Sequence, residues 1–187
     1  MVTAHFGNTC VQEHNDKESM TPVYEITEAL KMVKSDSPVL AAQGFSKISH
    51  ATFDNQNAKE AAGQAGAIEA IVNAMERNIS DETVQKDGCH ALREVALQCE
   101  ANMVQIREQG ALNAVLKAME AHPENEAVQA EGLWALVDFC SNTEENVTTA
   151  KKHQSIVDKA LDTHKANGDI QGRGQLLQKL FTGAYVG

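Results

Sequence analysis

The sequence predicts an all-α fold, a solenoid of about four repeated helical units. Of its 187 residues, 42% are hydrophobic but only 4% are aromatic, and only three prolines occur, which suits helices packed through small aliphatic side chains. Runs of Val, Ile, Thr and Tyr of the kind that form strands are absent. The chain also aligns with itself at an offset of 44 residues, as repeat proteins do.

Two copies of the repeat are clear. The segments 84–96 (VQKDGCHALREVA) and 128–140 (VQAEGLWALVDFC) align without a gap. Just upstream, 66–76 (GAIEAIVNAME) and 110–120 (GALNAVLKAME) align at the same offset. Apolar residues recur within each segment at helical spacing, so each copy is expected to contain a second and a third helix.

Two further copies, less regular, flank the clear ones. Before them, 23–33 (VYEITEALKMV) and 39–49 (VLAAQGFSKIS) resemble a second and a third helix. After them, 170–181 (IQGRGQLLQKLF) resembles a third helix, although Gln178 stands where Leu136 is expected. Irregular terminal copies are typical of solenoid caps.

These copies divide the chain into a short N-terminal segment and a repeat domain. Residues 1–20 lack helical periodicity, and we expect an extended or flexible segment whose apolar anchors, Phe6 and Val11, pack on a partner or back along the solenoid. The repeat domain is expected over 21–187. Its units are approximately 22–54, 55–98, 99–142 and 143–183.

Each later unit also begins with a short polar helix, 101–109 (ANMVQIREQ) in one and 144–153 (EENVTTAKKH) in the next. Three helices per unit, with G-A-[IL]-x-A-[IV]-[VL] followed by V-Q-x-x-[AG]-x-W-A-L, resemble the armadillo repeat over roughly residues 22 to 182. This resemblance implies a right-handed α-solenoid. It also implies a concave groove, lined by the third helices, that holds an extended peptide.

A glycine recurs inside every third helix, where it costs about 1 kcal/mol relative to alanine. We expect each of these glycines to let two helix axes approach closely, so that packing offsets the cost. The four positions are Gly44, Gly88, Gly132 and Gly174.

The armadillo groove carries two ladder positions on each third helix, one turn apart. In this chain the first position is occupied by Ser46, His90, Trp134 and Leu176, and the second by His50, Glu94, Asp138 and Leu180. Acids beside an indole suit a Lys or Arg side chain. We therefore predict a protein-binding groove for a basic extended segment; the alternative is a solvated edge with a half-buried tryptophan. The predicted groove residues are His50, His90, Glu94, Trp134 and Asp138.

The last copy has an apolar ladder. Leu176, Leu180 and the neighbouring Phe181 either fold over as a cap or form an end-docking surface for another chain.

Charge and composition exclude several other classes of partner and compartment. The net charge of −10 and the absence of Lys/Arg runs argue against nucleic acid. No apolar run approaches the length of a membrane span, and the N-terminus does not resemble a secretory signal, so we expect a cytoplasmic protein. Four scattered cysteines are expected to be reduced, buried thiols.

Sequence motifs for catalysis and cofactors are weak. The segment 168–174 (GDIQGRG) lacks the Lys-Ser/Thr pair of a phosphate loop, and 10–14 (CVQEH) has too few ligands for zinc. No nucleophile elbow or H-E-x-x-H helix occurs. We expect no cofactor and no metal.

These observations predict a non-catalytic protein–protein interaction module, an adaptor or scaffold that binds an extended and basic segment in its groove. The alternative is a structural subunit of a larger assembly that docks through its ends or its convex face. An enzyme is a remote third possibility.

Overall fold

The computed structural model describes residues 22–141 and 143–183, and within these ranges it contains eleven α-helices and no strand. The predicted all-helical fold is confirmed. The segment 1–20, with Phe6 and Val11, lies outside the described residues, so the expectation for it stays a prediction. The helices are α1 (Pro22–Val33), α2 (Pro38–Thr52), α3 (Gln56–Gln64), α4 (Ala67–Arg77), α5 (Glu82–Ala96), α6 (Glu100–Glu108), α7 (Ala111–Ala121), α8 (Glu126–Cys140), α9 (Glu144–Lys151), α10 (Gln154–Thr163) and α11 (Gly168–Thr182).

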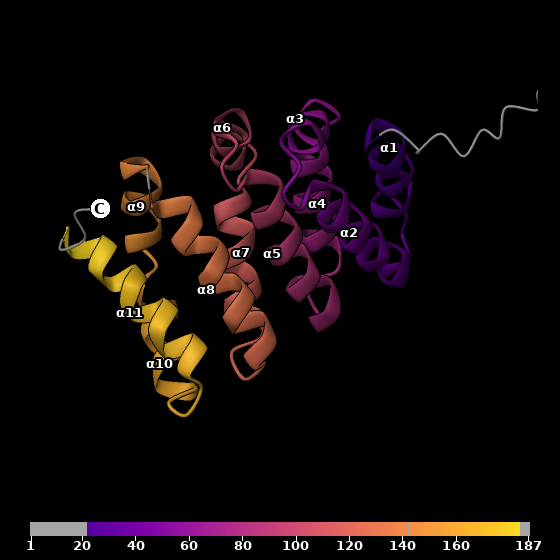
Figure 1. The fold of residues 1–187 in the computed structure, drawn as a ribbon. Helices are drawn as coiled ribbons and strands as arrows, with labels where there is room; N and C mark the ends of the chain where they lie inside the picture. The colour runs from indigo at the N-terminus through magenta and orange to yellow at the C-terminus, as the bar shows by residue number, and fades with distance from the viewer. Residues whose placement is uncertain (1–21, 142, 184–187) are drawn as a thin grey trace, which may run out of the picture.

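The helices stack as repeated units along one direction, from indigo to yellow in Figure 1. Helices α3 to α5, α6 to α8 and α9 to α11 form units of three, each with a short first helix, and α1 and α2 correspond to the second and third helices of the unit before them. The third helices pack on one another in the order α2, α5, α8, α11. They form a row on one face of the molecule, which we call the third-helix face (Figure 1).

Each third helix begins at a side-chain cap. The residue before the helix has extended backbone, and its side-chain oxygen accepts a hydrogen bond from a backbone N–H of the first turn, which stabilises a helix by about 1 kcal/mol. These four capping residues are Ser37, Asp81, Asn125 and Asn167.

The glycine of each third helix lies where the second helix comes closest. A Cβ atom at Gly88 would lie 2.6 Å from the side chain of Met75, and one at Gly132 would lie 2.6 Å from Met119. The other two glycines would place a Cβ 2.6 Å from a leucine of α10 and 2.9 Å from the backbone of α1. Close packing therefore accounts for the repeated glycine.

A glutamine repeats for a different reason, because it caps the carboxyl end of the second helix. Gln85 Nε2 donates hydrogen bonds to the carbonyl oxygens of Met75 and Asn78, both at 2.9 Å. Gln129 makes the same pair of bonds to the end of α7, and Gln171 to the end of α10. Carbonyl groups that a helix end leaves unpaired are thereby satisfied.

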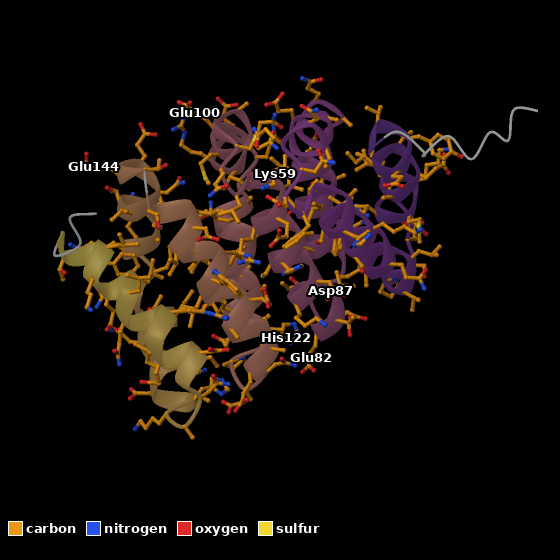
Figure 2. The ribbon with its side chains drawn as sticks, in the orientation of Figure 1. Lys59, Glu82, Asp87, Glu100, His122 and Glu144 are labelled. Carbon is orange, nitrogen blue, oxygen red and sulfur yellow. The ribbon has the colours of Figure 1, made fainter. Side chains whose placement is uncertain are left out.

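Neighbouring units are joined through their loops as well as their cores. His122 Nε2 donates to the carbonyl oxygen of Ile79 at 2.6 Å, and Asn125 Nδ2 donates to the Glu82 carboxylate at 2.7 Å. Figure 2 shows His122 and Glu82 side by side at one end of these units. Because the same pattern recurs one unit later, it fixes how consecutive units sit against each other.

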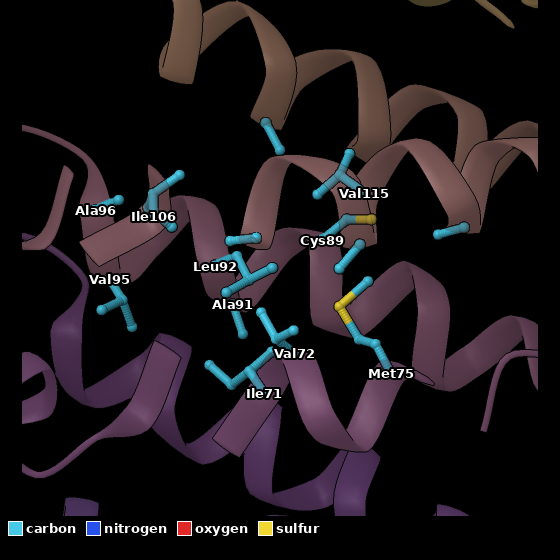
Figure 3. Packing of buried hydrophobic residues seen from close by; sticks show 14 of the residues in the cluster. Ile71, Val72, Met75, Cys89, Ala91, Leu92, Val95, Ala96, Ile106 and Val115 are labelled. Carbon is cyan, nitrogen blue, oxygen red and sulfur yellow. The ribbon is translucent and has the colours of Figure 1, made fainter. Parts of the chain in front are cut away.

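The hydrophobic core runs continuously from unit to unit. In Figure 3, Cys89 and Leu92 of α5 lie between Ile71 and Met75 of α4 on one side and Val115 of α7 on the other, and all five are buried. Among the described residues, no helix combines the length and apolar character that a membrane span requires.

Three cysteines, Cys89, Cys99 and Cys140, are buried free thiols. Burial raises the pKa of Cys140 to about 12, so its thiol is protonated and packs as a small apolar group. The fourth cysteine, Cys10, lies outside the described residues.

Candidate functional site

Trp134 lies between two arginines on the third-helix face. The guanidinium of Arg93, from α5, is 3.7 Å from the centre of the indole ring, and that of Arg173, from α11, is 4.1 Å from it. The stack therefore joins three consecutive third helices. Cation–π contacts of this kind contribute about 0.5–2 kcal/mol each.

Arg93 is also the ionic partner of both ladder acids. It pairs with the Glu94 carboxylate, and both side chains are buried. Its Nη1 lies 3.9 Å from Asp138 Oδ2 on the next third helix. Glu94 is thus engaged within the fold, and a direct contact between Glu94 and a ligand cation remains a prediction.

Two contacts hold the Arg173 guanidinium over the Trp134 ring. Its Nη1 donates to the carbonyl oxygen of Ala130 at 2.9 Å, and its Nη2 lies 3.6 Å from the Asp169 carboxylate. Both faces of the indole are therefore covered by the protein's own cations, although the residue remains 37% exposed. Only the edge of this ring is open to a ligand while Arg173 lies over it.

His90 holds the same ladder position one unit earlier. It contacts Glu131 on the next third helix, as Trp134 contacts Arg173. Its Nδ1 lies 3.3 Å from Glu131 Oε2. Burial by itself raises the pKa of Glu131, but the His90 ring, followed by Arg93 and Arg173, outweighs it and lowers that pKa. Glu131 is therefore ionised and half-buried beside the predicted ladder.

Asp138 is the ladder acid with the fewest partners. Its Oδ2 is buried and receives no hydrogen bond from the described residues. Burial raises the pKa of Asp138 and the Glu94 carboxylate adds to the rise, while Arg93 opposes it. The negative charge of the Asp138 carboxylate is therefore only partly balanced by neighbouring cations and hydrogen-bond donors.

The other predicted groove residues meet in a separate hollow. His50, His90 and Glu94 line a space of about 290 Å³ between α2 and α5, with Asp87 and the exposed ring of Phe53 at its margin. The structure thus divides the five predicted groove residues into two neighbouring groups. Trp134 and Asp138 lie together on α8, and the remaining three lie around this hollow.

Three functional candidates were missed by sequence reasoning, namely Arg93, Glu131 and Arg173. Glu131 and Arg173 occupy equivalent positions, three residues before the ladder position of their own units, and each meets the ladder residue of the unit before. That relation could have been found from the repeat alignment. Arg93 has no counterpart of similar chemistry in the next unit, where Val137 stands at its position.

The C-terminal apolar residues lie mostly inside the fold. Phe181 is buried, and Leu176 and Leu180 are partly buried against the core. Lys151 Nζ donates to the carbonyl oxygen of Phe181 at 2.9 Å, which ties α9 to the end of α11. This geometry favours the capping interpretation for Phe181, because its ring is not available at the surface for end-docking.

Among the described residues, no group of three His, Cys, Asp or Glu side chains is placed to hold a metal ion. The pair Cys10 and His14 lies outside them, so the expectation for that pair remains a prediction.

Stacked three-helix units with a ladder on their third helices define an armadillo-type solenoid, which confirms the predicted fold class. Residues 58–187 match the family model described as LRRK2 ARM repeat, and the chain belongs to this armadillo repeat family. Comparison with curated proteins and with solved structures gave no match. Armadillo arrays are in general non-catalytic modules for protein–protein interaction, and the family membership supports that general class for this chain.

Proposed function

We propose that the chain is an adaptor or scaffold whose third-helix face is a groove for an extended, basic segment of a partner protein. The observation that carries the proposal is the charge on this face. Three carboxylates, those of Asp87, Glu131 and Asp138, remain partly exposed on α5 and α8, with 26%, 25% and 19% of their side chains accessible. Figure 2 shows Asp87 on this face.

The cations nearby do not cancel this charge. Arg93 is buried and paired with Glu94, Arg173 is paired with Asp169, and Lys86 is paired with Asp87 at 3.0 Å. The Glu131 and Asp138 carboxylates therefore stay in excess on an already acidic protein. Such a surface attracts Lys- and Arg-rich segments and repels nucleic acid, and its attraction weakens with salt.

A structural role in a larger assembly is the second candidate. It is supported by a hollow of about 950 Å³ between α9 and the end of α11, with Val147, Lys151 and Leu180 in its walls. A partner docking there would bind the end of the solenoid and leave the third-helix face free.

We also propose a reducing, cytoplasmic setting, which the three free buried thiols support.

Fluorescence anisotropy with a labelled nonapeptide of alternating Lys and Ser, and with its Glu counterpart, tests the proposal. We expect the Lys peptide to bind, the Glu peptide not to bind, and the affinity to fall as salt rises. Combining Glu131→Gln with Asp138→Asn should weaken binding at least tenfold. The matched control combines Glu120→Gln with Asp162→Asn, two exposed acids on the second helices. Equal losses in both variants would show a non-specific charge effect and would contradict a groove.

A further inference from the structure

A third hollow lies at the edge of the third-helix face, between α6 and the end of α8, with Thr143 before α9 at its margin. It encloses about 500 Å³. Figure 2 shows Glu100 at the start of α6 and Glu144 at the start of α9 on the same side of the molecule. The walls of the hollow include Ala96, Met103 and Val104, which are apolar, and Glu100, Arg107 and Asp138, which are charged.

The backbone before α6 helps to form this hollow. Helix α5 ends at Ala96, and Gln98 adopts a left-handed conformation with φ of 59°, so that α6 can begin at Glu100 in a new direction. Asp54 makes the same turn one unit earlier, with φ of 48°. The hollow is therefore a product of the repeat geometry rather than of a long loop.

The apolar part of the wall suits an aliphatic chain. Val104 is 39% exposed and Met103 is partly buried, both on the side of α6 that meets the hollow. Methylene groups packed against these two side chains would remove apolar surface from water, which contributes roughly 25 cal/mol per Å².

The charged part of the wall is short of cations. Asp138 Oδ2 has no hydrogen-bond donor, and Arg93, its nearest cation at 3.9 Å, is paired more closely with Glu94. Arg107 cannot supply the missing charge, because its Nη1 lies 2.6 Å from the Glu145 carboxylate. Within the described residues, no cation lies at ion-pair distance from Glu100 either.

We propose that this hollow receives a Lys or Arg side chain of the partner segment, with its methylenes on Met103 and Val104 and its charged head at Asp138. The proposal rests on the proposed function and adds to it a pocket at the edge of the third-helix face. A neutral side chain of similar length would fill the space but leave Asp138 without a donor. An acidic side chain would be repelled by Asp138 and Glu100.

Methyl NMR of the full chain tests the pocket with small probes. The probes are the N-acetyl, N′-methylamide derivatives of lysine, norleucine and glutamate. We expect saturable shifts of the Met103 and Val104 methyl signals with the lysine probe and none with the other two. Equal shifts with lysine and norleucine would overturn the proposal, and so would an absence of shifts with lysine.

Two variants connect those shifts to the proposed contacts. Asp138→Asn keeps the shape of the side chain and should reduce the affinity for the lysine probe at least fivefold, while Asp162→Asn, on the exposed surface of α10, should leave it unchanged. Val104→Arg places a cation of the protein in the hollow and should abolish the Met103 shift. Unchanged lysine binding in either Asp138→Asn or Val104→Arg would contradict the proposal.

The Trp134 indole N–H signal separates this proposal from the proposed function. The labelled Lys/Ser nonapeptide should shift the Met103 methyl as well as the Trp134 signal. A shift of Trp134 alone would contradict the pocket and leave the groove supported. The reverse result would support the pocket and count against the groove.

Discussion

The Arg93 guanidinium lies 3.7 Å from the centre of the Trp134 ring, although the two residues belong to consecutive third helices, α5 and α8. The contact joins two units through the face on which a ligand would bind. A change at this face is therefore expected to alter both the stability of the stack and the affinity for a partner.

Arg173→Ala should uncover one face of Trp134 and remove a cation from the acidic face. Because Trp134 is the only tryptophan, its emission reports this site alone, and we expect a red shift of the maximum. The Lys/Ser nonapeptide should bind several-fold more tightly. Lys117→Ala, at a surface ion pair on α7, serves as the control and should change neither. An unchanged emission spectrum for Arg173→Ala would show that the guanidinium does not rest on the ring in solution.

Gly132→Ala should destabilise the fold by about 1–3 kcal/mol, because its Cβ would collide with Met119. Gly172→Ala is the matched control in another third helix, where nothing lies within 4 Å of the added atom. That control should be stabilising by roughly 0.5–1 kcal/mol. Chemical denaturation measures both, and equal effects of the two substitutions would argue against close packing at Gly132.

Gln129→Leu should cost about 1–3 kcal/mol, since it leaves two carbonyl groups at the end of α7 without their donor. Gln56→Leu, at an exposed position of α3, removes a glutamine that bonds only to Glu60 and should cost little. Denaturant midpoints compare the two. A smaller loss at Gln129 than at Gln56 would refute the capping role.

The stability lost in Glu131→Gln should depend on pH. The pKa of Glu131 is lowered in the folded state, so its ionised form stabilises the fold above the ordinary glutamate pKa. That contribution is lost as pH falls through the lowered value. We therefore expect a cost of up to about 1 kcal/mol at pH 7 that disappears in acid, as measured by denaturation at several pH values. A cost independent of pH would contradict a stabilising role for the ionised Glu131 carboxylate.

Asp138→Asn should stabilise the fold at neutral pH, whereas Glu131→Gln should destabilise it. The pKa of Asp138 is raised in the folded state, so its ionised form opposes folding at neutral pH, and protonation relieves this below the raised value. The amide should therefore be more stable than the parent at pH 7, with a gain that shrinks in acid. Thermal melts at pH 7 and in acid measure the difference. Destabilisation at pH 7 would show that Arg93 compensates this carboxylate fully.

The fold could be predicted from sequence because its main contacts repeat. The glycines that face Met75 and Met119 recur at a 44-residue offset, and an alignment of the chain with itself shows them directly. Gln85 and Gln129 also recur, although their capping role was not visible without the geometry of the helix ends.

The candidate site was only partly predictable, because its important contacts occur between units and do not all repeat. Trp134 and Asp138 were found from the ladder positions, but Glu94 is buried and paired with Arg93, whose position holds Val137 in the next unit. The hollow at Asp138 depends on the left-handed backbone at Gln98, which carries no glycine signal. Contacts that break the repeat are thus the ones that a repeat alignment cannot reveal.

Hydrogen–deuterium exchange of the full chain, with and without the Lys/Ser nonapeptide, tests the central claim most directly. A groove on the third-helix face predicts added protection in α5 and α8, centred on the turns that carry Glu131, Trp134 and Asp138, and none in the second helices α4, α7 and α10. Protection confined to those second helices, or to α9 and the end of α11, would contradict the groove and place the binding surface elsewhere.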